Sequence, residues 1–364
     1  MEALLNSLIP FLVLLTALVF VHELGHYVVA RRCGVRVLTF SIGFGPELFG
    51  WNDKSGTRWR ISAIPLGGYV KMFGDADASS SRGSDNDGMT DEEKAVSFHA
   101  KPLGSRSAIV AAGPLANFAF AAVLLAILYA FVGTPVASND ANVGAVSPDS
   151  AAEAAGLAEG DRIRAIDGRT LTGFEDLRTI VAASPDTVLS FRIERDGRLL
   201  DLDVTPAPVT LADGTTIGRV GIAPRFDYET RGIVDSVIGG AEGTWRLTVQ
   251  TVLFLGRIIT GDESSDNIGG PIGIAMLSGE MAKRGFGDYL FFAALLSVNL
   301  GLINLLPVPV LDGGHLAFYA VEAVRGRPLG EKAQEYGFRL GLVLILLLFL
   351  FATKNDIGRL AQLF

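Results

Sequence analysis

The feature that most constrains this chain is an HELGH pentad at residues 22–26, set inside a long apolar run. In a helix, residues four apart lie one above the other, so His22 and His26 can present two imidazoles to one metal ion, with Glu23 one step round. This pattern is typical of zinc sites with a built-in general base. Ionisable side chains inside a membrane span each cost about 2.5 to 3.5 kcal/mol, which favours a functional role over histidines that are merely hydrogen-bonded.

Composition places the pentad in a membrane protein that also has an aqueous domain. The 364 residues are 49% hydrophobic, with a mean hydropathy of +0.38, which is too apolar for an ordinary soluble enzyme. A formal charge of −8 does not suggest a nucleic-acid partner. Cys33 is the single cysteine, so neither a disulfide framework nor a cysteine zinc site is available. The first apolar run lacks a basic leader region and holds the pentad, so we interpret it as a retained span.

Hydropathy and charge predict four transmembrane helices. Basic residues such as Arg31 and Arg32 follow the first span and Arg325 follows the third, so the positive-inside rule puts these ends in the cytoplasm. The pentad then lies toward the cytoplasmic side, and both chain termini are periplasmic. The predicted spans are residues 1–36, 104–133, 288–315 and 338–353.

The segments between the spans differ in character. Residues 37–73 consist of short β-prone pieces broken by Gly and Pro, which either dip into the membrane beside the pentad or lie as a small sheet on its cytoplasmic surface. Residues 74–103 and 316–337 are predicted cytoplasmic loops, and residues 231–287 are predicted to be amphipathic and interfacial. No role is derived for the Gly- and Pro-rich stretch at 262–273.

Residues 138–230 change to a polar, alternating and turn-rich composition, which predicts a folded aqueous domain. Its order of a loop, a strand with a DG turn, a helix near 174–183 and two further strands resembles a PDZ domain of the bacterial protease type. In such a domain an open groove between strand and helix can bind a peptide by strand addition. The pattern leaves open whether this groove binds peptide or only obstructs access. The fold class is thus membrane α-helical, with four transmembrane helices, a membrane-associated β-sheet region and one extracytoplasmic PDZ-like α+β domain.

A catalytic zinc ion takes three protein ligands and keeps a position open for water, so the two histidines need a partner. Glu47 lies near the spacing of soluble zinc peptidases, but in a Gly- and Pro-rich region rather than on a helix. His315 is a second candidate. Asp312 is preferred, because it follows a proline-broken span end on the same predicted side of the membrane as the pentad.

Three motifs in order carry a family resemblance. HELGH at 22–26, GPLAN at 113–117 and NLLPVPVLDG at 304–313 resemble the site-2 protease family of intramembrane zinc metalloproteases, over nearly the whole chain. The resemblance implies that His22, His26 and Asp312 bind Zn²⁺ and that Glu23 is the catalytic base. It also implies that Asn304 helps to hold substrate, and that Gly43 and Gly45 belong to a membrane-dipping hairpin beside the site.

The same resemblance implies a substrate class. Membrane proteins with a single transmembrane helix are expected, either an anti-sigma factor already cut by a site-1 protease or a remnant signal peptide, in regulated proteolysis during envelope stress. Membrane lipid is the other expected partner. Only one PDZ-like unit is legible, whereas well-known bacterial members carry two. A zinc transporter and a non-catalytic PDZ scaffold are the alternatives: the first would want more ligands than a chain with 4 histidines offers, and the second leaves Glu23 without a purpose.

Overall fold

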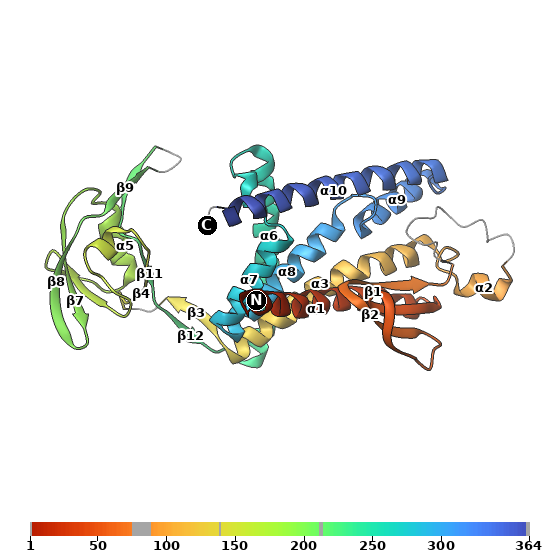
Figure 1. Ribbon diagram of the computed structural model, residues 1–364, viewed down its shortest axis with the longest axis horizontal. Helices are drawn as coiled ribbons and strands as arrows, with labels where there is room; N and C mark the ends of the chain where they lie inside the picture. The colour runs from red at the N-terminus through yellow and green to blue at the C-terminus, as the bar shows by residue number, and fades with distance from the viewer. Residues whose placement is uncertain (1, 75–88, 138–139, 211–213, 362–364) are drawn as a thin grey trace. The chain divides into compact units, whose positions relative to one another are not determined.

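The computed structural model describes residues 2–74, 89–137, 140–210 and 214–361 and divides the chain into two compact units (Figure 1). Unit 1 comprises Met1–Ala130 and Gly232–Phe364, and unit 2 comprises Phe131–Arg231. The elements of unit 1 are α1 (Glu2–Arg32), β1 (Val37–Asn52), β2 (Arg58–Met72), α2 (Asp91–Val96), α3 (Leu103–Phe131), α6 (Ile233–Thr260), a 3₁₀ turn (Ser265–Asn267), α7 (Pro271–Arg284), α8 (Phe286–Leu305), α9 (Asp312–Arg325) and α10 (Glu331–Ala361).

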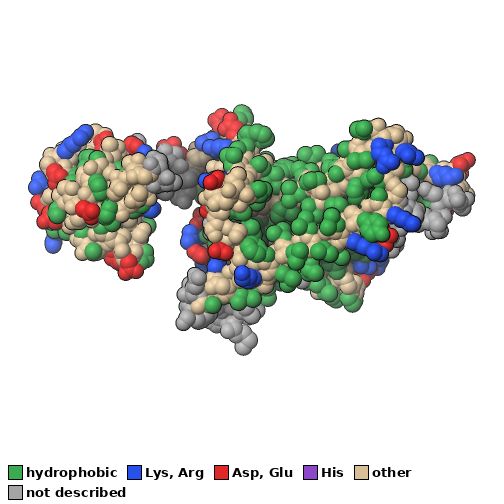
Figure 2. Space-filling view, turned by 90° about the horizontal axis from the view of Figure 1, so that it is seen from above, with side chains coloured by type: hydrophobic (Ala, Val, Ile, Leu, Met, Phe, Trp, Pro, Cys, Tyr) green, Lys and Arg blue, Asp and Glu red, His purple; other side chains and the backbone are tan. Residues whose placement is uncertain are grey.

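Four helices among the described residues are long and apolar enough to cross a membrane, as expected: α1, α3, α8 and α10. Figure 2 shows hydrophobic side chains over the middle of one face of unit 1, with charged side chains toward its ends. On α10 the apolar side chains are mostly exposed; Leu340, for example, is 70% exposed. A helix that is apolar all round and exposed in the isolated protein is suited to contact with lipid.

The boundaries around the third and fourth spans differ from the prediction. Within the predicted span at 288–315 the helix α8 ends at Leu305, because Pro307 and Pro309 break the hydrogen-bonding pattern as predicted, and a separate helix, α9, begins at Asp312. The predicted loop at 316–337 is largely helical, since α9 runs to Arg325 and α10 already begins at Glu331. In the other predicted loop, α2 forms with a Thr90 capping box, while residues 75–88 lie outside the described part of the chain.

The β-prone region forms one long antiparallel hairpin rather than separate short pieces. Its strands β1 and β2 pair from Asn52 and Arg58 back to Val37 and Met72. Residues 39–42 also lie beside residues 58–61, with both numbers rising together, so the hairpin is folded back on itself. The rings of Phe40 and Trp59 stack across this fold at 4.2 Å. The fold-back was missed because it depends on long-range pairing that local propensity does not encode.

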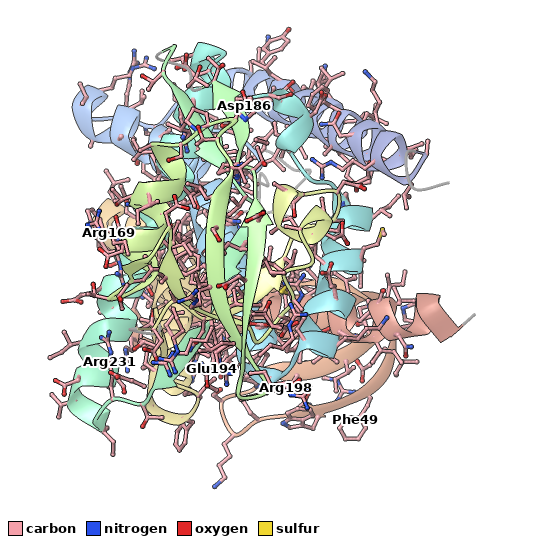
Figure 3. The ribbon with its side chains drawn as sticks, turned by 90° about the vertical axis from the view of Figure 1, so that its left-hand side faces the viewer. Phe49, Arg169, Asp186, Glu194, Arg198 and Arg231 are labelled. Atoms are coloured by element: carbon pink, nitrogen blue, oxygen red, sulfur yellow. The ribbon has the colours of Figure 1, made fainter. Side chains whose placement is uncertain are left out.

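Gly43 and Gly45 lie at this bend with φ values of +86° and +84°, a region that favours glycine. A Cβ atom at Gly43 would also lie 2.7 Å from the Ile64 carbonyl oxygen. Beyond the bend the strands carry exposed apolar side chains, including Phe49, which points outward in Figure 3. Both strands of the hairpin also pack on α1, the helix that carries the pentad.

The region at 231–287 contains two packed helices. One face of α6 is lined by small residues, and a Cβ atom at Gly240 would meet the Ala122 carbonyl oxygen of α3 at 2.3 Å. The opposite face is apolar and exposed. The Gly- and Pro-rich stretch begins α7: the Asp356 carboxylate of α10 accepts hydrogen bonds from the backbone amides of Gly270, Ile272 and Gly273.

Unit 2 is built on a four-stranded antiparallel sheet in the order β6-β5-β7-β8. The helix α5 packs on a core that includes Phe191, Ile193 and Leu177, all at most 2% exposed. Figure 3 labels Asp186 before β7, and Glu194 and Arg198 at the far end of the β7–β8 hairpin. The strands and helices of this unit are β3 (Thr134–Ala137), β4 (Val143–Val146), α4 (Ala151–Ala154), β5 (Arg162–Ile166), β6 (Arg169–Thr170), α5 (Phe174–Ala182), β7 (Leu189–Arg195), β8 (Arg198–Val204), β9 (Ala207–Thr210), β10 (Thr216–Arg219), β11 (Ile222–Pro224) and β12 (Phe226–Glu229).

The chain enters and leaves unit 2 through paired strands. β3 and β12 are antiparallel, with Ala137 opposite Phe226 and Thr134 opposite Glu229. Strands after residue 206 also belong to the unit, because β11 pairs with β4 and β10 pairs with β9. The domain is therefore closed by its own first and last strands.

Candidate metal centre

The two histidines of the pentad lie one turn apart on α1, each 9% exposed, with their Nε2 atoms 3.2 Å apart. α3 crosses α1 closely at this point because both helices carry glycine. A Cβ atom at Gly25 would lie 2.3 Å from the Ala112 carbonyl oxygen, and one at Gly113 would lie 2.3 Å from His26 Nε2. The glycine of the pentad is thus required by helix packing, and Gly113 leaves room for both imidazole rings.

Hydrogen bonds from α3 orient both rings. His26 Nδ1 lies 2.9 Å from the Ile109 carbonyl oxygen, to which its N–H donates, so Nε2 carries the free lone pair. His22 Nδ1 lies 3.1 Å from the amide of Asn117, whose Oδ1 is buried without a hydrogen-bond partner. Turning that amide by 180° lets Oδ1 accept from Nδ1–H, which frees His22 Nε2 as well. Such outer contacts are the usual support of metal-binding histidines.

A compact turn between α8 and α9 positions Asp312. Val310 has φ of +105°, a strained value for a β-branched residue. The two glycines after the aspartate pack directly on backbone: a Cβ atom at Gly313 would lie 2.3 Å from the Leu305 carbonyl oxygen, and one at Gly314 would lie 2.4 Å from that of Val308. This packing places the first residue of α9 at the histidine pair.

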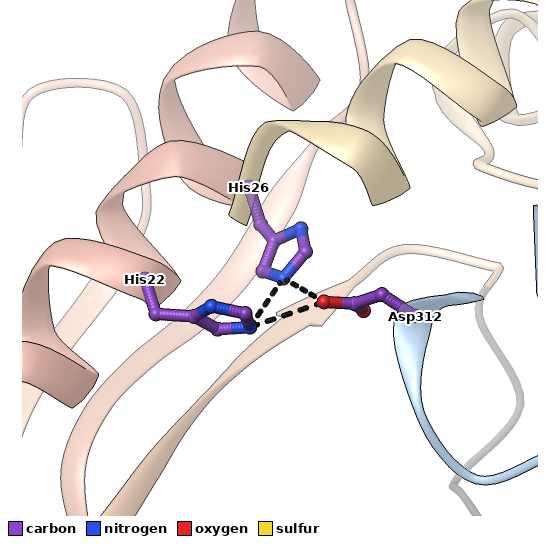
Figure 4. Close-up of side chains that lie close together, drawn as sticks. All are labelled: His22, His26 and Asp312. Carbon is purple, nitrogen blue, oxygen red and sulfur yellow. Dashed lines mark hydrogen bonds and ion pairs between the residues drawn. The ribbon is translucent and has the colours of Figure 1, made fainter. Parts of the chain in front are cut away.

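The three donor atoms form a nearly equilateral triangle (Figure 4). Asp312 Oδ2 lies 3.2 Å from His22 Nε2 and 3.5 Å from His26 Nε2, matching the 3.2 Å between the nitrogens. With zinc bonds of about 2.0 to 2.2 Å and tetrahedral angles, ligand atoms lie about 3.3 to 3.5 Å apart. Asp312 Oδ2 is buried and has no hydrogen-bond donor. Two nitrogen lone pairs and a carboxylate oxygen facing one point require a cation, so the set fits zinc.

Glu23 lies beside this triangle and faces β2. Val70 of β2 lies near enough for its backbone amide to act on the Glu23 carboxylate. A Cβ atom at Gly68 would lie 3.3 Å from Glu23 Cγ, so this glycine allows the strand to approach the helix. The strand, the glutamate and the histidine pair are therefore neighbours.

The other sequence candidates lie outside the triangle. Among the described residues, His22, His26 and Asp312 are the one set of three metal-ligating side chains that converge. Glu47 pairs with Arg58 within the hairpin, and the His315 ring packs on Phe338. The Asn304 amide donates to the Leu300 carbonyl of its own helix, so the structure does not show it at the histidines.

Several supporting residues were missed by sequence reasoning. Gly25, Gly113 and the Ile109 carbonyl were not predicted to shape the site. The sequence signal for Gly25 and Gly113 is their place in the HELGH and GPLAN motifs, as small residues within two apolar spans. Asn117, the last residue of the GPLAN motif, contacts His22.

A buried His–His–carboxylate set beside a glutamate, in a unit with four helices apolar enough to cross a membrane, defines a metallopeptidase site. The sequence comparisons agree, because the pattern of Peptidase family M50 matches residues 10–348. The chain belongs to this family, the site-2 protease family, and is a membrane metalloprotease.

Relatives from bacteria cover nearly the whole chain. A protein named as a zinc metalloprotease in Rhizobium meliloti is 49% identical over 98% of this chain and 99% of its own length. Metalloprotease MmpA of Caulobacter vibrioides is 38% identical over 98% and 96%. Regulator of sigma-E protease RseP of Escherichia coli is 34% identical over 99% and 100%. That last alignment has 461 positions against 364 residues here, so RseP contains segments that this chain lacks.

Proposed function

We propose that this protein hydrolyses peptide bonds within or beside transmembrane segments of other membrane proteins, using a zinc ion held by His22, His26 and Asp312. The observation that carries the proposal is the triangle of Nε2, Nε2 and Oδ2 atoms with edges of 3.2 to 3.5 Å. Zinc in such a site lowers the pKa of a bound water and polarises a carbonyl group.

Glu23 is the proposed general base and acid. Its place next to the histidines, on the strand-facing side of α1, puts its carboxylate where it can take a proton from the attacking water and return it to the leaving amine. Asn117 and the Ile109 carbonyl keep the two imidazoles in the orientation that presents Nε2.

The hairpin is proposed to present the substrate. A transmembrane helix hides its carbonyl groups in its own hydrogen bonds, so the cleaved segment has to become extended. Among the described residues, residues 68–71 of β2 pair with residues 39–42 of β1 alone, and Gly68 approaches Glu23, which supports an outer edge of β2 close to the base. A substrate strand added along this edge would lie next to Glu23. Gly43 and Gly45 shape the bend of the same hairpin, and Asn304 is proposed to contact substrate after its side chain turns from Leu300.

The proposed substrates have one transmembrane helix and have already lost a bulky outer domain to a site-1 protease. An anti-sigma factor is one such substrate, in envelope stress signalling, and a remnant signal peptide is another. The name of RseP, a regulator of sigma-E, supports the first. The basic ends of α1 and α9 support a cytoplasmic metal centre in the bacterial inner membrane, with both termini and the PDZ-like unit 2 in the periplasm.

A Glu23→Gln variant tests the catalytic assignment. It should retain zinc, because no metal ligand changes, and should lose cleavage by about 10²- to 10⁴-fold, the usual contribution of a general acid–base group. Zinc content and the cleavage rate of a membrane-embedded reporter are measured on the same preparation. A variant that cuts at the native rate would remove Glu23 from the mechanism.

The matched control is Glu47→Gln. This change removes a carboxylate that pairs with Arg58 in the hairpin and leaves the metal centre untouched. It should keep both zinc and cleavage. Loss of zinc in the Glu47 variant would instead support Glu47, rather than Asp312, as the third zinc ligand.

A further inference from the structure

A buried ion pair joins α3 to α9, away from the proposed metal centre. Arg106 on α3 donates from Nη2 to Glu322 Oε1 at 2.6 Å and from Nη1 to Oε2 at 3.3 Å. The two side chains are only 10% and 15% exposed. Arg106 also donates from Nε to the Lys101 carbonyl oxygen, and its guanidinium lies 4.9 Å from the centre of the Tyr319 ring. Every part of this guanidinium is therefore held by a defined partner.

Arg106 shares one face of α3 with the residues that hold the histidines. Ile109 accepts from His26, Gly113 makes space for both rings, and Asn117 contacts His22. Residues 106, 109, 113 and 117 are spaced by three or four, so they form one stripe along the helix. Ile109, Gly113 and Asn117 of this stripe contact the histidines directly. Arg106 contacts α9, the helix that begins with Asp312, so it can act on the aspartate only through that helix.

Asp312 is the first residue of α9, and Glu322 lies ten residues later, about 15 Å along the helix axis. At its start α9 follows the turn at Val310, whose φ is +105°. A contact at Glu322 restricts how the whole helix can rotate about its axis or shift along it. Either motion would carry the Asp312 carboxylate away from the histidine nitrogens, which lie 3.2 and 3.5 Å from it.

We propose that Arg106 and Glu322 are positioning residues: their ion pair sets α9 against α3 and so keeps Asp312 within coordinating distance of His22 and His26. This inference rests on the proposed zinc site. Neither residue touches the ion or a substrate in this role. A two-point guanidinium–carboxylate contact suits it, because its geometry is fixed in direction as well as in distance.

The test measures the zinc affinity of the full-length protein in detergent by competition with a chromogenic chelator. Glu322→Gln should weaken zinc binding about 10- to 100-fold, the range found when a supporting contact of a metal ligand is lost. The control is Glu335→Gln, which breaks an exposed pair with Arg339 on α10 and should leave the zinc affinity unchanged. Arg106→Lys serves if Glu322→Gln does not fold, since it keeps the charge but loses the two-point contact, and it should weaken zinc binding in the same direction.

The Asp312→Asn background separates positioning from general stability. If Glu322 acts through Asp312, Glu322→Gln should weaken zinc binding no further once Asp312 is replaced. It should still lower the melting temperature of the metal-free protein. Equal weakening in both backgrounds, or no weakening in either, would overturn the positioning role. If Asp312→Asn by itself leaves zinc affinity unchanged, the proposed metal site fails instead, so the two failures are distinguishable.

Discussion

Gly113 on α3 leaves the space that the imidazole rings of His22 and His26 occupy. A Cβ atom there would lie 2.3 Å from His26 Nε2 and 2.8 Å from His22 Cε1, closer than real Cβ contacts. The clash falls on ring atoms that are held by Ile109 and Asn117, so neither ring can move freely away. The residues around the ligands thus restrict the site as strongly as the ligands themselves.

A Gly113→Ala variant should lose zinc affinity by at least 10-fold, because the added methyl displaces the imidazoles from the triangle. Chelator competition measures this change. Gly104→Ala is the matched control: it lies on the same helix, and a Cβ atom there meets nothing within 4 Å. Unchanged zinc binding in the Gly113 variant would show that the rings have room to retreat.

At the scale of elements, α7 depends on a side chain from the far end of the chain. Asp356, which is 2% exposed on α10, accepts three backbone amides at the start of α7. Those amides have no partner within their own helix, and a carboxylate also complements the helix dipole. α7 in turn packs against α1, where a Cβ atom at Gly279 would lie 2.6 Å from Ser7 Oγ. The last helix therefore stabilises a neighbour of the helix that bears the pentad.

An Asp356→Ala variant should destabilise unit 1 by about 1 to 3 kcal/mol, since it leaves buried amides unsatisfied. Hydrogen exchange should increase first in α7. Lys354→Ala, an exposed neighbour on α10, is the control and should change little. Exchange that rises uniformly, or not at all, would contradict the capping role.

At the scale of the whole molecule, unit 2 has its own hydrophobic core and its own buried ion pair, between Asp161 and Arg195. Asp161 is 1% exposed and accepts from Arg195 at 2.6 and 2.7 Å and from the Ala158 amide at 2.8 Å. Burial alone would raise the pKa of Asp161, but these hydrogen bonds and the charge of Arg195 hold the pKa below its ordinary value. A lowered folded-state pKa adds stability above the unfolded pKa near 4, and that stability is lost as the pH falls through the folded pKa.

Hydrogen exchange in unit 2 of the full-length protein should therefore accelerate as the pH is lowered below about 4, after correction for intrinsic exchange. Asp161→Asn should cost about 2 kcal/mol at neutral pH and reduce this acid dependence. Asp203→Asn, which changes an exposed aspartate on β8, should behave like the wild type. If hydrogen exchange in the Asp161 variant still accelerates at low pH, titratable groups other than Asp161 cause the acid dependence.

The boundaries of unit 2 also define a clean excision. Ala137 and Phe226 are paired at the end of the β3–β12 ladder, so residues 138–225 can be replaced by a short Gly-rich turn. If unit 2 excludes bulky substrates, the excised protein should cleave an untrimmed substrate as fast as a trimmed one. The ratio of the two rates is the measurement. A ratio equal to that of the intact chain would place the selectivity elsewhere.

The chain's motifs were sufficient to predict a membrane metallopeptidase. Residue spacing on a helix puts His22, Glu23 and His26 together without any tertiary information, and apolar length predicts four spans. Asp312 could be proposed from its place after a proline-broken span. The secondary structure of unit 2 was also readable, since alternation and DG turns are local signals.

What only the tertiary structure decided depends on contacts between residues far apart in the chain. The fold-back of the hairpin joins residues 39–42 to residues 58–61, and Asp356 caps a helix 86 positions earlier. The same holds for Gly25 against Ala112 and for Arg106 against Glu322, 216 positions apart. Local propensity and periodicity describe one segment at a time, whereas these close approaches exist only after the helices have packed. The sequence alone therefore identified the ligand residues His22, His26 and Asp312. The packing of α3 and α9 against α1 determined that their side chains converge.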